Sequence, residues 1–544
     1  MHNRQAVVNC TLVSKNTQPK RSLAGIAGIV AVATLISKVI GLFREQAIAA
    51  AFGDGPVVNA YAYAYVIPGF LLILLGGING PFHSALVSVL AKRQKSEAAP
   101  IVETVNTLVG IMLVVVTVVL ICFAGTFIDI FGPGLDIQQR TLAIQQLRFM
   151  APVAILAGLI GIGFGSLNAA DQYWLPSISP LFSSLAIVGG VGWFMWQWGA
   201  QVNTPEYIQV GAIVLAGGTL AGAILQWLAQ VVAQWRSGLG KLRLRFDWRN
   251  PGVNDVIKVM LPATLASGML QINVYTDLFF ASDISNAAAA MRYANFIVLT
   301  PLGIISNMIL VPMLPVFSQL AAPENWSDLK IRIRQGLMLT ALTMLPLSAI
   351  FIALGLPIVR LIYERQAFDL QASLVVAPVL MTYGLGMFFY LGRDVLVRVF
   401  YALGDGETPF RISIANIFLN AILDYFLVDA FATPGLVMAT IGVNVVSMVI
   451  FLWLLHRRLQ GFPLREWSWA FLRLIIASLW AGLASWGTSY GWQRFVGSDN
   501  LLFQLLQLGL STLVALAIFA FLASRMKLPE VEILTSRLRQ KLGI

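Results

Sequence analysis

The sequence predicts an all-α integral membrane protein with about fourteen transmembrane helices. The chain has 544 residues, of which 58% are hydrophobic and 11% are charged, whereas a soluble domain carries roughly 25% charged residues. Long apolar runs recur along the whole chain, and nearly all basic clusters follow even-numbered runs. The 46 glycines and 14 tryptophans fit close helix contacts and aromatic belts at the two membrane surfaces.

Apolar stretches of about 20 residues, the length that crosses a bilayer, define the predicted helices in chain order. Residues 1–20 are polar and the first apolar stretch runs into a full-length span, so no cleavable signal peptide is expected. The predicted spans are 24–50, 57–90, 104–130, 141–168, 177–199, 207–235, 253–281, 287–320, 333–362, 372–403, 409–429, 434–458, 468–492 and 500–525.

Lysine and arginine are concentrated before the first span and after the even-numbered spans, which places both chain ends in the cytoplasm by the positive-inside rule. The net charge of +11 therefore reflects membrane topology, and no nucleic-acid partner is expected. The basic clusters are Lys15, Lys20 and Arg21; Lys92, Arg93 and Lys95; Arg236, Lys241, Arg243, Arg245 and Arg249; Lys330, Arg332 and Arg334; Arg457, Arg458 and Arg465; and Arg525, Lys527, Arg537, Arg539 and Lys541.

Two similar halves are visible in the sequence. Ala151-Pro152-Val153 recurs as Ala377-Pro378-Val379, although chance similarity between apolar helices is an alternative. Six spans per half give a parallel repeat about a pseudo-two-fold axis along the membrane normal, and transporters built this way bind substrate between the lobes and work by alternating access. The predicted domains are a cytoplasmic tail 1–22, an N-lobe 23–235, a basic cytoplasmic linker 236–252, a C-lobe 253–458, and 459–544 with two last helices and a basic cytoplasmic tail.

Ionisable residues inside the spans are the main functional signal, because a charge at bilayer depth costs a few kcal/mol and normally faces a cavity or a partner. In span 24–50, Lys38 and Glu45 share a helix face, and a bend at Gly41 would turn Arg44 toward the same cavity. Ammonium and guanidinium groups suit a diphosphate. Alternatively, Arg44 reaches the outer interface and pairs with Glu45.

Span 287–320 adds Arg292 and Asn295, which lie on one helix face because they are three residues apart. Both are expected to line the same polar lumen as the residues of the first span. The alternative is an interfacial arginine just inside the outer loop.

A second, acidic set lies in the C-terminal half. Two carboxylates with an amide and a hydroxyl suit Na⁺ or a proton, and the alternative is that the aspartates cap neighbouring helices. The sequence contains no P-loop, zinc-ligand spacing or nucleophile elbow, which disfavours an ATPase or a membrane-bound hydrolase; a transporter rather than an enzyme is expected. The set comprises Asp277, Asn420, Asp424 and Thr440.

The stretches Ser37-Lys-Val-Ile-Gly-Leu-Phe-Arg-Glu and Arg398-Val-Phe-Tyr-Ala-Leu-Gly-Asp resemble the MurJ/MviN family, the lipid II flippases of bacterial cell-wall synthesis in the MOP exporter superfamily. The resemblance extends from Ser22 to the C-terminus. It implies fourteen helices in two six-helix lobes, with two further helices that extend a groove for the lipid tail. It also implies that Lys38 and Arg44 bind the lipid pyrophosphate.

The chain departs from the family pattern at several positions. The usual aspartate of the second helix aligns with Asn59, an arginine aligns with Leu72, and the usual Asp-Arg pair of the eighth helix aligns with Asn295-Phe296, so Arg292 is expected to supply the missing charge. Relatives bind sodium between the seventh, eleventh and twelfth helices, which makes Na⁺ a candidate coupling ion; no other cofactor is expected. The resemblance implies a polar cavity lining of Glu45, Asn59, Asn295 and Arg398, and a sodium site of Asp277, Asn420, Asp424 and Thr440.

The expected function is a flippase of the bacterial inner membrane that moves lipid II or a similar undecaprenyl-diphosphate-linked precursor to the outer leaflet. Membrane potential, with or without sodium, would drive the return step. One alternative is a flippase for an O-antigen or exopolysaccharide repeat, and another is a non-transporting scaffold for cell-wall enzymes. A drug or cation antiporter should have an acidic cavity. The protein is expected to be a monomer, with cell-wall synthesis enzymes as further candidate partners.

Overall fold

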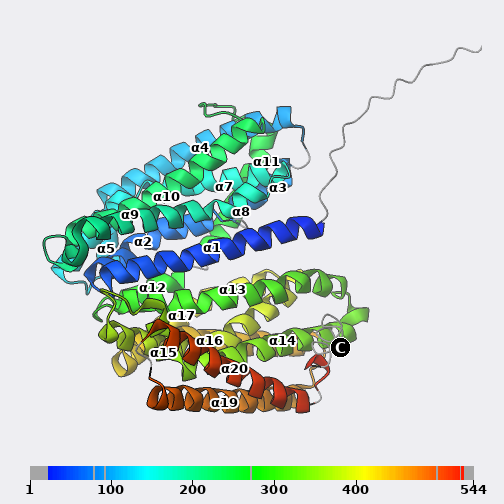
Figure 1. Ribbon diagram of the computed structural model, residues 1–544. Helices are drawn as coiled ribbons and strands as arrows, with labels where there is room; N and C mark the ends of the chain where they lie inside the picture. Colours follow the sequence, from blue (N-terminus) through cyan, green and yellow to red (C-terminus); the bar gives the residue numbers. More distant parts are fainter. Residues whose placement is uncertain are drawn as a thin grey trace, which may run out of the picture.

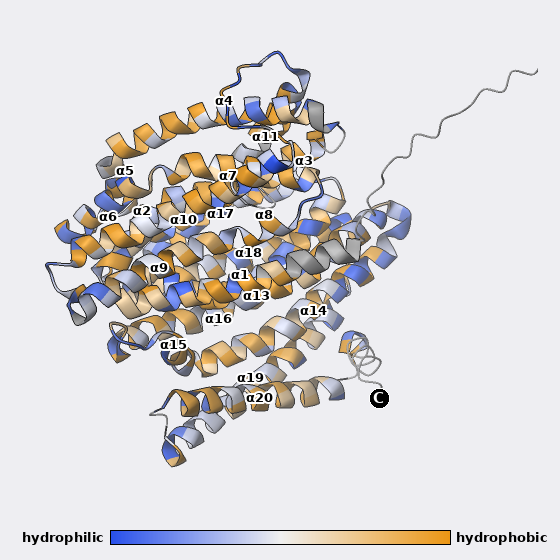
Figure 2. Cartoon of the chain, turned by 45° about the horizontal axis from the view of Figure 1, so that its top comes forward, coloured by the Kyte–Doolittle hydropathy of each residue, from blue (hydrophilic) through white to orange (hydrophobic). Residues whose placement is uncertain are grey.

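The computed structural model describes residues 23–77, 80–90, 93–269, 272–497, 500–526 and 528–531. Within these ranges the regular structure is helical, apart from one bridge between Arg365 and Phe368. The helices are apolar over most of their length, and hydrophilic residues gather at helix ends and in connections (Figure 2). The expected tail 1–22 and the basic residues Lys92, Lys527, Arg537, Arg539 and Lys541 lie outside the described ranges.

The first group of helices corresponds to the first six predicted spans, several of which are divided in two. The polypeptide alternates direction along this group, and the helices lie side by side (Figure 1). The group consists of α1 (Leu23–Phe52), α2 (Pro56–Leu74), α3 (Pro81–Leu90), α4 (Lys95–Cys122), α5 (Ala124–Phe131), α6 (Ile137–Met150), α7 (Val153–Ala169), α8 (Trp174–Ile178), α9 (Pro180–Trp198), the 3₁₀ helix η1 (Gly199–Asn203) and α10 (Ile208–Arg236).

The second group contains the remaining helices. Its last two members, α19 and α20, pack against each other and lie beside α14, at the edge of the molecule farthest from α4 (Figure 1). The group consists of α11 (Pro251–Met269), α12 (Ile272–Ala281), α13 (Ala287–Gln319), the 3₁₀ helix η2 (Pro323–Asn325), α14 (Trp326–Ala353), α15 (Gly355–Tyr363), α16 (Leu370–Ala402), α17 (Glu407–Phe431), α18 (Thr433–Arg458), α19 (Leu464–Phe495) and α20 (Leu501–Arg525).

Proline and glycine explain several of the divisions that the expected spans did not include. Span 57–90 is divided between α2, which ends at Leu74, and α3, which begins at Pro81; the sequence between them is rich in glycine, and glycine and proline both disfavour a helix interior. Span 141–168 is bent by 41° between α6 and α7, where Pro152 lacks the backbone N–H that the helix would use. Long apolar runs therefore overestimate the length of single straight helices.

Eleven described helices are long and apolar enough to cross a membrane, or twelve if the bent pair α6 and α7 is one span. The protein is therefore an all-helical, multi-pass membrane protein. This count is lower than the fourteen expected spans, in part because the predicted span 253–281 is divided into α11 and α12, with residues 270–271 outside the described part.

The two parts of that divided span have different neighbours. α11 packs mainly against α3, and Val253 and Val256 belong to a buried cluster with Phe82 and Val102. α12 packs instead mainly against α17, with smaller contacts to α18 and to α5 of the first group. The first half of the expected seventh span thus lies against the first group of helices, and only the second half joins the second group.

A hydrogen-bonded aspartate connects the beginning of α17 to the end of α18. Asp405 accepts hydrogen bonds from the backbone N and the Oγ1 of Thr408 at 3.0 and 2.9 Å, and from Arg458 Nη1 at 2.8 Å. Partial burial of Asp405 disfavours its charge, but the bonds from Thr408 and Arg458 outweigh this effect and lower the pKa of Asp405 below its ordinary value. The ionised carboxylate therefore stabilises the fold.

Asp405→Asn is expected to lower the unfolding temperature of the purified protein at neutral pH. The stabilisation is present above the unfolded pKa of about 3.9 and is lost as the pH falls through the lower folded pKa, so variant and wild type should converge in acid. Thermal unfolding between about pH 3 and pH 7 measures this. Asp429→Asn, at an exposed aspartate, is the control, and a deficit of equal size at all pH values would contradict the assignment.

Candidate functional site

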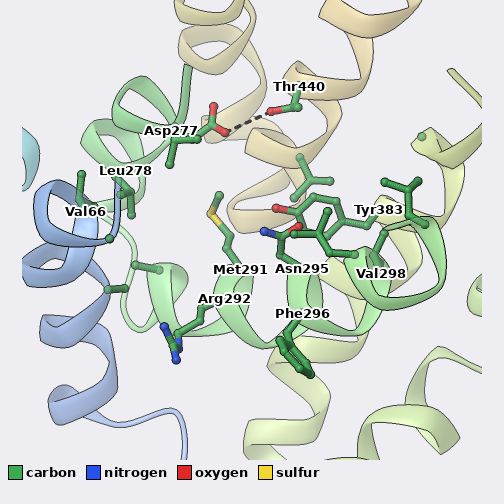
Figure 3. A pocket seen from close by; sticks show the side chains of 18 of the residues that line it. Val66, Asp277, Leu278, Met291, Arg292, Asn295, Phe296, Val298, Tyr383 and Thr440 are labelled. Carbon is green, nitrogen blue, oxygen red and sulfur yellow. Dashed lines mark hydrogen bonds between the residues drawn. The ribbon is translucent and has the colours of Figure 1, made fainter. Parts of the chain in front are cut away.

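A cavity of about 580 Å³ lies where α1, α2, α12, α13, α16 and α18 meet. Most of its wall is apolar or aromatic, and a few polar side chains interrupt it. Figure 3 shows Arg292 on one side of this region and the Asp277–Thr440 pair on another, with Met291 and Asn295 between them. The polar lining residues are Arg44, Glu45, Asp277, Arg292, Asn295, Thr440 and Asn444, together with Tyr65, Tyr275, Tyr383 and Tyr390.

One carboxylate holds two arginines from different helices. Glu45 Oε1 of α1 accepts bonds from Arg44 Nε at 3.0 Å and Arg44 Nη2 at 2.7 Å. Arg292 Nη2 of α13 lies 2.9 Å from the same oxygen and 3.0 Å from Oε2. Glu45 is only 1% exposed. We call Arg44, Glu45 and Arg292 the ionic triad; it connects the first group of helices to the second.

The ionic triad carries a net positive charge, because two guanidinium groups share one carboxylate. The arginine side chains remain 25% and 19% exposed, whereas the carboxylate is almost completely covered. Arg292 Nε is buried without a hydrogen-bond partner in the described part of the molecule. The arginines therefore retain donor capacity toward the cavity, where forked N–H groups match phosphate oxygens.

Aromatic packing fixes the position of Arg292. Its guanidinium carbon lies 5.0 Å from the centre of the Tyr61 ring on α2, a distance at which a cation is attracted by the ring face. The Phe296 ring would lie 3.6 Å from a Cβ at Gly41, which is an ordinary van der Waals contact between α13 and α1. α1 is continuous from Leu23 to Phe52, and Arg44 reaches the cavity without an interruption at Gly41.

The structure also brings together the four residues of the acidic set. Asn420 Nδ2 donates to Asp277 Oδ1 at 2.6 Å and to Asp424 Oδ2 at 2.7 Å. Thr440 Oγ1 donates to Asp277 Oδ2 at 3.2 Å. Asp277 and Thr440 line the cavity, whereas Asn420 and Asp424 are fully buried behind them. We call these four residues the oxygen cluster.

The donor set of the oxygen cluster fits a small hard cation. Its oxygens come from two carboxylates, an amide and a hydroxyl, and Na⁺ accepts ligands of this type. Within the described residues, Asn420 Oδ1 and Asp424 Oδ1 are buried and have no hydrogen-bond partner. Two adjacent buried carboxylates are costly when both are ionised, and a bound cation or a proton would remove that cost.

Contacts at the end of α1 join the two groups of helices. The backbone N of Ala367 donates to Ala50 O at 3.1 Å, and Tyr293 Oη donates to Gly53 O at 2.7 Å. Tyr363 Oη in turn donates to Tyr293 O at 3.2 Å. Gly53 has a φ of +60°, and a Cβ there would lie 2.6 Å from Ala367 O, so only glycine fits. We call these five residues the seal.

Three expected site residues lie elsewhere. Lys38 and Arg398 are half-buried and do not line the cavity. Asn59 is 2% exposed and bridges helices instead: its Nδ2 donates to Gln139 Oε1 at 2.6 Å, and its Oδ1 accepts from the backbone N of Ala289 at 3.1 Å. The amide of Asn59 is thereby used in packing, because both its donor and its acceptor are already engaged.

Sequence reasoning did not anticipate the aromatic wall. Tyr61 contacts Arg292, and Tyr65 lines the cavity one turn later on α2. The alternation Ala60-Tyr61-Ala62-Tyr63-Ala64-Tyr65 was the available signal, since bulky polar aromatics separated by alanine are unusual within a lipid-facing helix. Tyr383 and Tyr390 of α16 carry no comparable pattern.

The family model of the lipid II flippase MurJ matches residues 48–506, which is most of the chain and includes α2 to α19. The chain belongs to the MurJ family. A relative from Synechocystis sp., described as a probable lipid II flippase MurJ, is 61% identical over 97% of this chain and 99% of its own length. The lipid II flippase MurJ of Burkholderia cenocepacia is 28% identical over 86% of this chain and 89% of its own length.

Solved structures support the same fold. A structure described as the lipid II flippase MurJ in an inward closed conformation has a TM-score of 0.74 at 22% identity, and covers 92% of this chain and 99% of that chain. An inward-facing multidrug resistance MATE family transporter of the MOP superfamily has a TM-score of 0.58 at 15% identity, and covers 80% of this chain and 98% of that chain. MurJ membership thus comes with a helical arrangement that MATE transporters share.

Proposed function

We propose that this protein flips lipid II, an undecaprenyl-diphosphate-linked peptidoglycan precursor, from the inner to the outer leaflet of the bacterial cytoplasmic membrane. Membership of the MurJ family supports this activity. The observation that supports it in the structure is the ionic triad, which offers two arginines to an anion inside a cavity with largely apolar walls. The protein is a transporter, so no covalent bond is made or broken.

The ionic triad can exchange one acceptor for another. A diphosphate that enters the cavity offers more oxygen acceptors than Glu45, and charge-assisted bonds to phosphate are strong in a water-poor site. When Arg44 and Arg292 turn toward the diphosphate, the bridge between α1 and α13 through Glu45 weakens. Substrate binding then favours separation of the two groups of helices, which is the movement required for alternating access.

The oligosaccharide-peptide head group would occupy the cavity, while the prenyl chain remains in lipid. We place that chain along α19 and α20, which lie outside the two lobes and present many exposed apolar side chains, among them Leu479, Trp480, Leu483, Leu513 and Phe521. This arrangement keeps the apolar tail out of the charged cavity.

We further propose fourteen spans, with both chain ends in the cytoplasm. The count follows when each divided pair, such as α2 with α3 or α11 with α12, is treated as one broken crossing. The seal then faces the outside, and the proposed lobes 23–235 and 253–458 repeat six crossings each. The same proposal includes the basic linker 236–252 and the N-terminal tail 1–22 on the cytoplasmic side. It also includes segment 459–544, with the two last helices and a cytoplasmic tail.

Depletion of this protein from its host tests the main proposal. Lipid II should accumulate, and the fraction that an externally added lipid II-degrading enzyme can reach should fall. Re-expression of the wild-type protein should restore that fraction. An unchanged external fraction would contradict the proposal, and accumulation of an O-antigen or exopolysaccharide lipid instead would support the other flippase type.

We propose that Na⁺ is the coupling ion and that the oxygen cluster holds it. Na⁺ at tenfold its dissociation constant should stabilise the folded protein by about 1.4 kcal/mol, whereas K⁺ at equal ionic strength should not. Asp424→Asn should abolish this difference, because it removes one of two carboxylates. Thermal unfolding of purified protein in matched NaCl and KCl measures it, with the exposed Glu206→Gln as control; a Na⁺ effect that survives Asp424→Asn would place the ion elsewhere.

A further inference from the structure

The connection between α10 and α11 has a regular pattern that the flipping mechanism does not use. After Arg236 the chain turns, with φ of +71° at Gly238 and +125° at Gly240, and residues 243–247 form no helix or turn. Basic and apolar residues alternate in Lys241-Leu242-Arg243-Leu244-Arg245-Phe246. In an extended chain such alternation places the two types on opposite sides.

A buried carboxylate on α4 holds one side of this segment. Glu103 is 3% exposed; its Oε1 accepts from the backbone N of Lys241 at 3.0 Å, and its Oε2 accepts from Arg243 Nε at 2.6 Å. The backbone N of Arg245 donates to Thr107 Oγ1 at 3.0 Å. A Cβ at Gly240 would lie 3.1 Å from Glu103 Cγ. These contacts fix which side chains face α4.

The other side of the segment is apolar and exposed. Leu242, Leu244, Phe246 and Trp248 are 64%, 77%, 51% and 62% exposed. The rings of Phe246 and Trp248 lie 6.0 Å apart at 34° to each other, so they share one face. We call these four residues the apolar strip. Large apolar side chains that are exposed together usually mark an interaction surface.

The position of the apolar strip favours lipid as its partner. Thr107 lies within Glu97–Cys122, the part of α4 that is long and apolar enough to cross the membrane. The segment therefore runs beside a membrane-crossing part of α4, and Figure 1 shows this connection at the edge of the molecule.

The positive charge of this segment favours anionic lipid as the partner. Lys241, Arg243 and Arg249 are exposed, and Arg243 keeps 60% of its side chain exposed even while it contacts Glu103. The carboxylates within the same contacts are Glu103 and Asp247, so a surplus of positive charge remains next to the apolar strip. Basic residues beside inserted aromatic and aliphatic side chains are the pattern of interfacial anchors that bind anionic membranes.

We propose that residues 241–249 form a membrane-bound anchor for anionic lipid. The apolar strip inserts into the leaflet at which α10 ends, and the neighbouring lysine and arginines bind lipid phosphates. Glu103 sets the register, so that the apolar side chains point into the lipid rather than onto α4. The anchor would hold the connection between the two lobes at the membrane surface, whether or not the protein is flipping a substrate.

Fluorescence quenching in reconstituted vesicles tests this anchor. A single cysteine at position 244 (Leu244→Cys, with Cys10→Ser and Cys122→Ser) carries an environment-sensitive fluorophore, and lipids with a spin label on the acyl chain quench it. Quenching should be at least about threefold greater than for Glu324→Cys, a matched exposed site in the connection before α14, because only position 244 lies within the acyl boundary. Equal quenching at the two sites would overturn the proposal.

The lipid charge is varied in the same system. Phosphatidylglycerol should favour insertion over phosphatidylcholine, and Lys241→Gln with Arg249→Gln should reduce that preference about fivefold for each charge removed. These variants leave the Glu103 bonds to the backbone N of Lys241 and to Arg243 intact. If insertion did not depend on lipid charge, the proposal that the anchor binds anionic lipid would be overturned. If the label at position 244 were protected from the quencher in native membranes but not in purified vesicles, a protein rather than lipid would cover the apolar strip.

Discussion

Cells that depend on the Arg44→Ala variant are expected to accumulate lipid II on the cytoplasmic side and to lose external lipid II. The variant removes one of the two guanidiniums that face the cavity. A hydrogen bond to a charged group contributes about 1.5–3 kcal/mol, so the affinity for the diphosphate should fall roughly tenfold to a hundredfold for each bond lost. Arg292→Ala should have the same effect. The externally accessible fraction of lipid II, normalised to protein level, measures the loss.

Two comparisons make this result specific. Arg44→Lys keeps the charge but loses the fork, so it should retain part of the activity. Arg332→Ala removes an exposed arginine of α14 and should leave flipping unchanged. Normal external lipid II in cells that carry only Arg44→Ala would refute a role of the ionic triad in transport and would favour a scaffold function.

The second large effect concerns stability. Glu45→Ala should reduce the free energy of unfolding by about 3–5 kcal/mol, the usual cost when one partner of a buried ion pair is removed. Arg44 and Arg292 would lose their shared acceptor and would repel each other across a poorly solvated site. Unfolding of the purified protein in detergent measures this loss.

A double-mutant cycle separates this effect from a simple packing defect. Arg292→Met in the Glu45→Ala background removes the repulsion and should recover part of the lost stability, which gives a non-additive coupling energy. Additive effects of the two substitutions would show that Glu45 and Arg292 do not depend on each other energetically.

Much of the fold could be predicted because membrane helices must satisfy their own backbone hydrogen bonds. Each expected span contains at least one described helix at nearly the same residues, for example α10 (Ile208–Arg236) for 207–235. The breaks were harder to place, since a proline such as Pro152 can lie inside a single membrane-crossing helix as well as at a break between two. The packing of α11 against α3 could not be read from hydropathy, which is similar for all lipid-exposed and buried helices.

The candidate site could be predicted only in part, for a geometric reason. The free-energy cost of a charge at bilayer depth singled out Arg44, Arg292 and Asp277 in the sequence. The structure places all three at one cavity. The same reasoning cannot tell which side of a helix faces that cavity. Asn59 bonds residues 80 and 230 positions away in the chain, and no local pattern indicates such partners. The sequence left open whether Arg44 lines a cavity or pairs with Glu45. In the structure it does both.

α1 connects the seal to the ionic triad as one rigid rod. The helix has 30 residues and is about 45 Å long at 1.5 Å per residue. Arg44 lies eight residues from Phe52, beside the seal, and 21 residues from Leu23. If the seal is the pivot, a displacement of 1 Å at Arg44 moves the far end of α1 by between three and four times as much. A small local rearrangement around a bound diphosphate is thus mechanically amplified into a wide change at the opposite membrane surface.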